Sequence, residues 1–167
     1  MKLYRYVGPK QIAERIGPEP TGVSIGSPED VSTWVRDAAQ ELNAGLVIAT
    51  FVVDAGGVLL VADRRSEHVA CAGGYPVRSA GEITFAVGRT VEVAEVSNQS
   101  TGYCPEPASW PAVAEALSRA GLLAPDGFSL ACEFRRCVGC GGLTLVKAGV
   151  FECGVCEAKL PTTYNGQ

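Results

Sequence analysis

The chain has 167 residues, which is enough for one domain or for one domain with a small appendage. Hydrophobic residues make up 47% of it and the net charge is −4, which excludes wholesale disorder and the dense basic face of a duplex-binding protein. The longest apolar run, residues 46–53, is too short to span a bilayer, and the N-terminal MKLYRYVGPKQ lacks the apolar core of a secretory signal. We therefore expect a cytoplasmic protein without a membrane partner.

The first half of the chain predicts a β-hairpin and two helices. In order, we expect a strand at residues 2–7, a short helix at 9–16, a loop at 18–26, a helix after Ser27, and a hairpin of strands 46–53 and 58–62. Ser27 is a good N-cap, and apolar residues then recur at helical spacing at Val31, Trp34, Val35, Ala38 and Leu42. This periodicity favours Trp34 as a core anchor over a ligand platform. The strand at 46–53 is apolar on both faces, which is typical of a central position in a sheet.

The second half predicts a second hairpin, a loop, a helix and a last strand. The hairpin comprises residues 83–87 and 91–96, the loop residues 97–108, and the last strand residues 128–134. Ser109 and Gly121 bound the helix, whose apolar stripe is Val113, Ala116, Leu117 and Ala120. Together these elements predict an α+β fold with a mostly antiparallel sheet and two or three helices, formed by residues 1–131.

Four of the seven cysteines form two CxxC pairs near the C-terminus, Cys137/Cys140 and Cys153/Cys156. Each pair can place two thiolates on one ion, and two pairs complete the tetrahedron that zinc prefers. Gly139, Gly141 and Gly154 are expected to permit the tight backbone of the two turns. We predict one Zn²⁺ per chain, with iron at the same site or a disulfide or redox role for either pair as the alternatives. The ion should be structural, because four sulfurs leave no open position for catalysis. About thirty residues resemble a zinc ribbon, with a hairpin around Ala148-Gly149, so residues 132–167 are predicted to be a zinc ribbon with a short tail.

The centre of the chain is polar and rich in small residues. Segments 67–74, 76–82 and 97–105 are predicted to be loops between strands, where binding sites tend to lie. The candidate ligand-binding residues are Glu67, Glu82, Asn98, Ser100 and Tyr103. The candidate catalytic residues are His68, Glu82, Ser100, Tyr103 and Cys104, with His68 as a general base that a carboxylate orients. The alternative is structural, since such side chains also hold loops in shape through bonds to the backbone.

These segments also contain Ala72-Gly73-Gly74, Ala80-Gly81-Glu82, Ser100, Tyr103, Pro105 and Gly121, in that order. The order resembles a module found in many bacterial proteins and in the plant IQ-motif calmodulin-binding family. The resemblance covers residues 58–122 and implies a shared fold unit in a bacterial type of protein, with no settled chemistry. The module's two histidines and its arginine are replaced by Glu67, Gly102 and Cys104. No IQ motif is present, so calmodulin is not an expected partner.

Three functional hypotheses follow. The first is a non-enzymatic interaction or regulatory module, comparable to a small immunity protein, that binds another protein through residues 67–82 and 97–105. The second is an enzyme that acts on a nucleotide-like or protein substrate, which requires one pocket to gather His68, Glu82, Ser100 and Tyr103. The third is nucleic-acid binding by the ribbon through Arg135 and Arg136, although basic residues diluted by acidic ones are typical of a solvated face.

Overall fold

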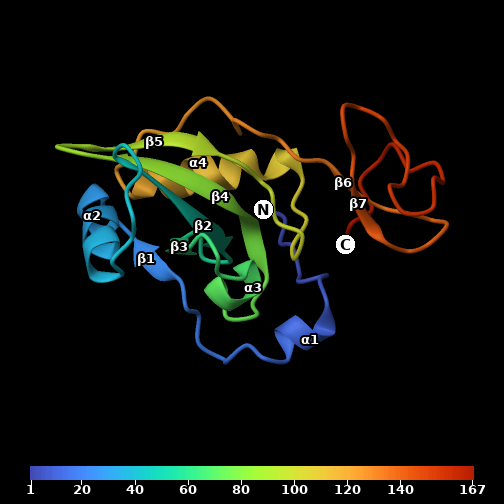
Figure 1. Ribbon diagram of the computed structural model, residues 1–167, viewed down its shortest axis with the longest axis horizontal. Coiled ribbons are helices and arrows are strands. Elements are labelled where there is room, and N and C mark those ends of the chain that lie inside the picture. The colour runs from blue at the N-terminus through green and yellow to red at the C-terminus, as the bar shows by residue number, and fades with distance from the viewer.

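The computed structural model describes all 167 residues and has an α+β fold (Figure 1). In chain order its elements are α1 (Lys10–Ala13), β1 (Val23–Ile25), α2 (Pro28–Asp37), β2 (Leu46–Asp54), β3 (Leu59–Asp63), α3 (His68–Cys71), β4 (Val77–Val87), β5 (Val91–Val96), a 3₁₀ turn η1 (Pro107–Ser109), α4 (Trp110–Arg119), β6 (Phe134–Arg136) and β7 (Leu143–Leu145). The first five strands form an antiparallel sheet in the order β1-β3-β2-β4-β5, and β6 and β7 form a separate two-stranded sheet. None of the helices has the length and apolar character that a bilayer crossing requires.

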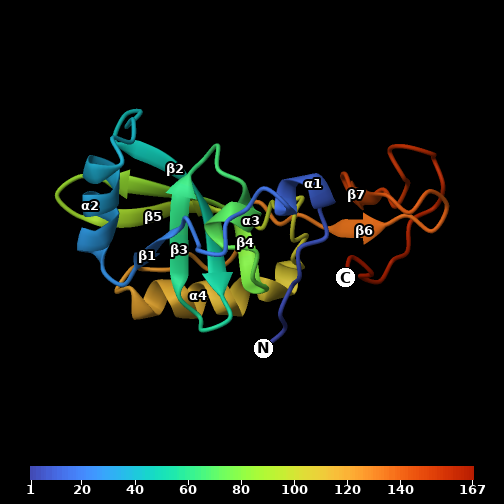
Figure 2. The ribbon, with the colours of Figure 1, turned by 90° about the horizontal axis from the view of Figure 1, so that it is seen from below.

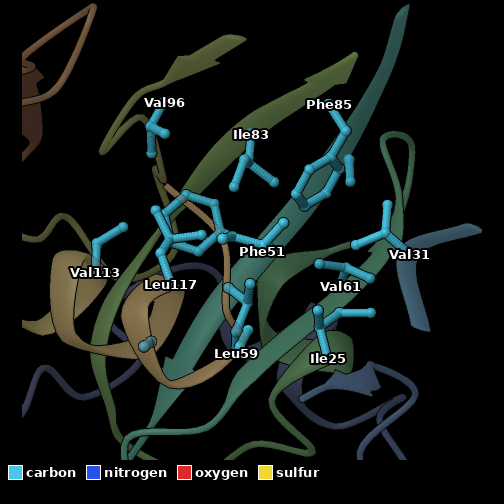
Figure 3. Packing of buried hydrophobic residues seen from close by; sticks show 14 of the residues in the cluster. Ile25, Val31, Phe51, Leu59, Val61, Ile83, Phe85, Val96, Val113 and Leu117 are labelled. Carbon is cyan, nitrogen blue, oxygen red and sulfur yellow. The ribbon is translucent and has the colours of Figure 1, made fainter. Parts of the chain in front are cut away.

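The central position predicted for β2 is confirmed, and it explains why this strand is apolar on both faces. On one face Phe51 and the residues that alternate with it pack against α2 and α4 in the larger core (Figure 3). On the other face Val52 belongs to a second core, which contains Tyr4 and Tyr103 together with residues of α3. The sheet is therefore covered on both sides, and the second side is built mostly from short and irregular segments.

The helix predictions are confirmed where capping and periodicity agree. The Ser27 side chain accepts a hydrogen bond from the N–H of Asp30, and Trp34 is buried in the core as predicted. The predicted stripe is wrong at Ala38 and Leu42, which are exposed, because the helix ends at Asp37 and Ala39 takes a left-handed φ of 48°. In α4 the whole predicted stripe is buried, and Gly121 ends the helix with a φ of 66°.

Several boundaries differ from the sequence-based expectation. The predicted loop at 67–82 instead contains α3 and the first half of β4, because Val77 to Gly81 pair with β2. A short strand, β1, lies in the predicted loop at 18–26 and pairs with β3. The predicted strand at 2–7 is reduced to one bridge between Tyr4 and Val77. The predicted strand at 128–134 becomes irregular until Phe134, since its only earlier pairing is one bridge from Leu130 to Ser97.

The C-terminal ribbon lies at one end of the main sheet and is tied to it by specific contacts (Figure 1). Asn98 exchanges hydrogen bonds with the backbone of Cys132, where the ribbon begins. The hydroxyl of Tyr164 donates to the carbonyl of Cys104 at 2.8 Å, and the ring of Tyr164 packs against the second core. The Gln167 side chain accepts from the N–H of Arg5 at 2.7 Å. The chain after the ribbon thus returns to the segment that opens the fold.

Candidate metal centre

The four sulfur atoms of Cys137, Cys140, Cys153 and Cys156 lie within 4.8 Å of one another. The Cys137 and Cys156 sulfurs are 3.5 Å apart, and the Cys140 and Cys153 sulfurs are 3.7 Å apart. A tetrahedron with metal–sulfur bonds of about 2.3 Å has sulfur–sulfur edges of about 3.8 Å, so the observed spacing fits one central ion. The same distances are far longer than a disulfide bond of about 2.05 Å. The predicted four-cysteine cluster is therefore present and can hold a metal ion.

The two CxxC turns share one backbone pattern. In the first turn the N–H of Gly141 donates to the carbonyl of Cys137, and in the second the N–H of Glu157 donates to the carbonyl of Cys153, at 2.8 and 2.9 Å. Gly141 and Glu157 occupy equivalent positions and both are left-handed, with φ of 75° and 60°. The prediction that glycine is needed for the tight backbone therefore holds for Gly141, whereas the second turn forces a glutamate into the same conformation.

Neither Gly139 nor Gly154 has the left-handed backbone for which a glycine was predicted at these positions. A Cβ at Gly139 would lie 3.2 Å from the Cβ of Ala158, so this glycine allows the two turns to approach each other closely. A Cβ at Gly154 would meet nothing within 4 Å, so neither φ nor space requires a glycine there. The two turns are thus similar in hydrogen bonding but not in packing.

The electrostatics of the cluster favour a bound cation. The N–H groups of Cys156 and Val155 point at the Cys153 sulfur and lower the pKa of that thiol to about 6. The N–H of Ala158 acts in the same direction on Cys156, but the facing sulfurs, that of Cys137 first, and desolvation raise its pKa to about 12. The Cys153 thiol therefore ionises readily whereas the Cys156 thiol resists ionisation, because negative sulfurs this close repel one another. A divalent cation removes this repulsion and allows all four to ionise.

The interior of the ribbon contains a residue whose role the sequence did not reveal. Arg135 is only 6% exposed, and its guanidinium group donates to the carbonyls of Phe134, Pro161 and Thr162 and to the carboxylate of Glu133. The expectation that Arg135 offers a surface charge to nucleic acid is therefore wrong, because its donors are used inside the ribbon. The sequence around Arg135 looks like that of an ordinary surface arginine. Its buried position becomes clear only from the strand pairing, which places residue 135 inward.

A second structural residue of the ribbon that the sequence did not reveal is Asn165. Its side chain accepts from the N–H of Arg136 and donates to the carbonyl of the same residue, both at 2.8 Å. It thereby imitates a neighbouring strand along the free edge of β6. No sequence signal marks this role, since the segment around Asn165 has no strand pattern.

The predicted catalytic residues are dispersed in the structure. His68 lies in α3, where its Nε2 donates to the carbonyl of Gly81 at 2.9 Å. Burial lowers the pKa of His68, and the carbonyl of Gly81 opposes that shift. Glu82 lies on β4, half-exposed and 3.9 Å from the guanidinium of Arg64, while Glu67 is exposed beside α3. The ring of His68 is thus tied to β4, and burial disfavours its charged form.

The candidates of the 97–105 loop face the interior. Asn98, Ser100, Tyr103 and Cys104 are each at most 1% exposed. The Ser100 hydroxyl accepts from the N–H of Tyr103, and the Tyr103 hydroxyl donates to the carbonyl of Tyr75. Burial raises the pKa of the Cys104 thiol to about 12, which makes it a poor nucleophile at neutral pH. These side chains hold the loop against the sheet, whereas Glu82 lines a surface pocket.

The chain was compared with family models, with curated proteins and with solved structures, and nothing matches it. The resemblance of residues 58–122 to the bacterial and IQ-motif module therefore stays a prediction. What the geometry itself establishes is an α+β fold that carries a four-cysteine cluster able to hold a metal ion.

Proposed function

We propose that the four cysteines bind one structural zinc ion and that the protein acts in the cytoplasm as a non-enzymatic interaction module. The observation that carries the first half is the set of sulfur–sulfur distances, 3.5 and 3.7 Å across the cluster. A closed tetrahedral set of four thiolates is typical of structural zinc sites, whereas catalytic zinc keeps one position for water or substrate. The soft all-sulfur donor set disfavours magnesium and calcium, which prefer oxygen ligands.

The proposed ion joins two turns that have little other support. The small core of the ribbon consists of Cys137, Cys153 and Leu160, with Phe151 and a few other partly buried residues around them. Two of these three buried residues are metal ligands, so without the ion the apolar packing that remains is small. Structural zinc supplies folding free energy directly in domains of this size. We infer that zinc fixes the ribbon and thereby places Tyr164 and Gln167 on the main domain.

The surface that supports an interaction role lies on β4 and β5. Glu82, Thr84, Glu95, Ser97 and Gln99 line a shallow pocket of about 130 Å³. This volume is below the range of small-molecule sites, which is about 300–1,000 Å³. Two carboxylates on an exposed and shallow surface suit a basic segment of a partner protein. This surface includes Glu82 of the segment 67–82 and Ser97 and Gln99 of the segment 97–105. Contact with a protein therefore fits this surface better than a small substrate does.

The zinc half of the proposal is tested by measuring metal content and melting temperature together. The purified protein is expected to carry one zinc per chain, and cobalt in its place should show the intense charge-transfer bands of a tetrathiolate site. Cys137→Ser should lose the metal and lower the melting temperature. Cys71→Ala, at a buried thiol outside the cluster, should keep the metal. A Cys137→Ser protein that retains one zinc and melts like the wild type would contradict the proposal.

The interaction half is tested by charge reversal on the proposed surface. A zinc-loaded protein with Glu82→Lys and Glu95→Lys should lose partners that the wild type captures from an extract by chemical cross-linking. Glu19→Lys, on an exposed loop outside the pocket of Glu82 and Glu95, is the matched control and should capture them all. Equal capture by the double variant and the control would show that this surface is not the contact.

A further inference from the structure

One part of the main sheet is left open on the side that carries the second core. Ala80 belongs to that core, and Glu82 and Thr84 follow it on the same face of β4, since side chains two residues apart in a strand point the same way. Figure 2 shows that the β4–β5 hairpin extends toward the end of the molecule that carries α2, away from α3. The shallow pocket of about 130 Å³ lies on this open part of the sheet.

Three polar side chains come together in the wall of this pocket. Glu95 lies directly opposite Thr84 in the antiparallel pair of β4 and β5, and Glu82 precedes Thr84 by two residues on β4. Side chains directly opposite each other have Cβ atoms about 4.5–5.5 Å apart, and two residues along a strand span about 6.5 Å. Both carboxylates are therefore neighbours of the same threonine side chain.

Thr84 is a buried polar residue without a partner inside the protein. It is only 8% exposed, and its hydroxyl forms no hydrogen bond to another residue. In contrast, the hydroxyl of Thr50 on the adjacent strand donates to the carbonyls of Arg64 and Ser66 at 3.3 and 3.2 Å. No fully enclosed side-chain oxygen of the protein lacks a partner, so the Thr84 hydroxyl must be reached from the pocket that it lines. A nearly buried hydroxyl of this kind is stabilised when a ligand or water supplies the missing hydrogen bond.

The two carboxylates of the pocket are available to a cation. Glu95 forms no ion pair, and the one partner of Glu82 is Arg64, whose guanidinium lies 3.9 Å away, beyond hydrogen-bond distance. Glu82 and Glu95 are also the only charged residues that line the pocket. The pocket thus combines two carboxylates and an unpaired hydroxyl with no basic group of its own.

We propose that this pocket binds the ammonium group of a single lysine side chain of a partner protein; the proposal rests on the interaction function proposed above and specifies what the partner presents. The three donors of an ammonium group match the carboxylates of Glu82 and Glu95 and the hydroxyl of Thr84. The apolar stem of the lysine passes Ile48 and Leu130, which line the same pocket. A guanidinium fits less well, because its planar fork suits one carboxylate in its own plane rather than three acceptors around a point.

The test is a titration of the zinc-loaded, isotope-labelled protein with the peptide acetyl-Ala-Ala-Lys-Ala-Ala-amide, followed by the shifts of the amide resonances. Saturable shifts are expected at residues 82–84 and 95–99. The same peptide with Nε-acetyl-lysine should bind at least about ten-fold more weakly, because it lacks the positive charge. The arginine version of the peptide should also bind more weakly than the lysine version.

Three variants separate the pocket from general charge attraction. Thr84→Val keeps the net charge and should weaken the lysine peptide about ten-fold, without lowering the melting temperature, because the hydroxyl has no internal partner. Glu95→Gln should weaken the peptide by a similar factor. Glu92→Gln removes the same charge from an exposed glutamate of β5 that does not line the pocket, and should leave the affinity unchanged.

Four results would overturn the proposal. Equal binding of the lysine peptide to Thr84→Val and to the wild type would show that only general charge attraction acts, while the proposed interaction surface would stand. Equal losses in Glu92→Gln and Glu95→Gln would show the same. Calcium chloride that gives the same shifts at lower concentration than the peptide would show a metal site instead. Peptide binding together with equal partner capture by the Glu82→Lys, Glu95→Lys protein and its control would refute the interaction function itself, and with it the claim that a partner supplies the lysine.

Discussion

Asn98 makes three buried hydrogen bonds, two of which join the main domain to the ribbon, and its removal should be among the most damaging single changes in the protein. The side chain is fully buried. Its Nδ2 donates to the carbonyls of Pro105 and Cys132, each at 2.8 Å, and its Oδ1 accepts from the N–H of Cys132 at 2.6 Å. Asn98→Ala deletes all three bonds and leaves their backbone partners in the interior.

The magnitude follows from the number of bonds. Each hydrogen bond contributes about 1 kcal/mol net, and each buried group that is left without a partner costs about 1–3 kcal/mol unless water reaches it. Asn98→Ala should therefore lower the free energy of unfolding by about 3–5 kcal/mol. The estimate allows for water that enters the small cavity left by the side chain and pairs with some of the freed backbone groups. This is a large part of the 5–15 kcal/mol that typically separates folded from unfolded protein.

The assay is urea unfolding of the zinc-saturated protein, followed by circular dichroism and tryptophan fluorescence. Asn98→Asp should also destabilise, because it keeps the acceptor for Cys132 but places a carboxylate against two carbonyl oxygens. Gln99→Ala removes the exposed neighbouring side chain and should change the free energy of unfolding by less than about 0.5 kcal/mol. A loss below about 1 kcal/mol for Asn98→Ala would refute the reasoning, since three buried bonds cannot be that weak in the interior.

Three further changes test other parts of the structure. Gly81→Ala should destabilise by about 2–3 kcal/mol in thermal unfolding, because its Cβ would lie 1.9 Å from the carbonyl oxygen of Ser97; an unchanged melting temperature would contradict that contact. Glu157→Gly should stabilise by about 1 kcal/mol in urea and leave the zinc content at one, because it relieves a left-handed φ of 60°; a lower stability would show that the carboxylate has a role of its own. Burial lowers the pKa of His68, so below pH 6.5 the unfolded chain binds a proton that the folded protein excludes, and stability should fall as the pH falls; His68→Gln should weaken this dependence, and an identical pH profile would contradict it.

The features that sequence predicted correctly are those that local patterns determine. Ser27 and Gly121 bound their helices, and the stripe from Val113 to Ala120 lies in the core, because capping and periodicity act within a few residues. The two CxxC pairs were equally local, since each turn brings its own sulfurs together. Four thiols at this spacing have few other arrangements than a shared ion.

The errors occurred where distant pairing decides the structure. The segment from Val77 to Gly81 contains small residues that suggested a loop, yet it pairs with β2 apart from a bulge at Arg78. In contrast, the alternating residues 128–133 pair only with the end of β5, through one bridge from Leu130 to Ser97, and stay irregular. Predictions for polar residues were wrong for the same reason. Asn98, for example, was predicted to bind a ligand, but it is buried and binds the backbone of Cys132, 34 positions later. Sequence alone does not show which backbone groups a buried side chain will satisfy.

The two faces of the main sheet depend on the ribbon to different degrees. The larger core is closed by α2 and α4, which are helices of ten residues with their own apolar stripes. The second core has only the four-residue helix α3 and a set of irregular segments, and Tyr164 from beyond the ribbon packs against it. Tyr164 and Gln167 reach that position only if the ribbon is folded, and two of the three buried residues of the ribbon core are cysteines of the four-sulfur cluster. Under the proposed zinc site, loss of the ion therefore weakens the face that contains Tyr4 and Tyr103 before it affects the face covered by the two longer helices.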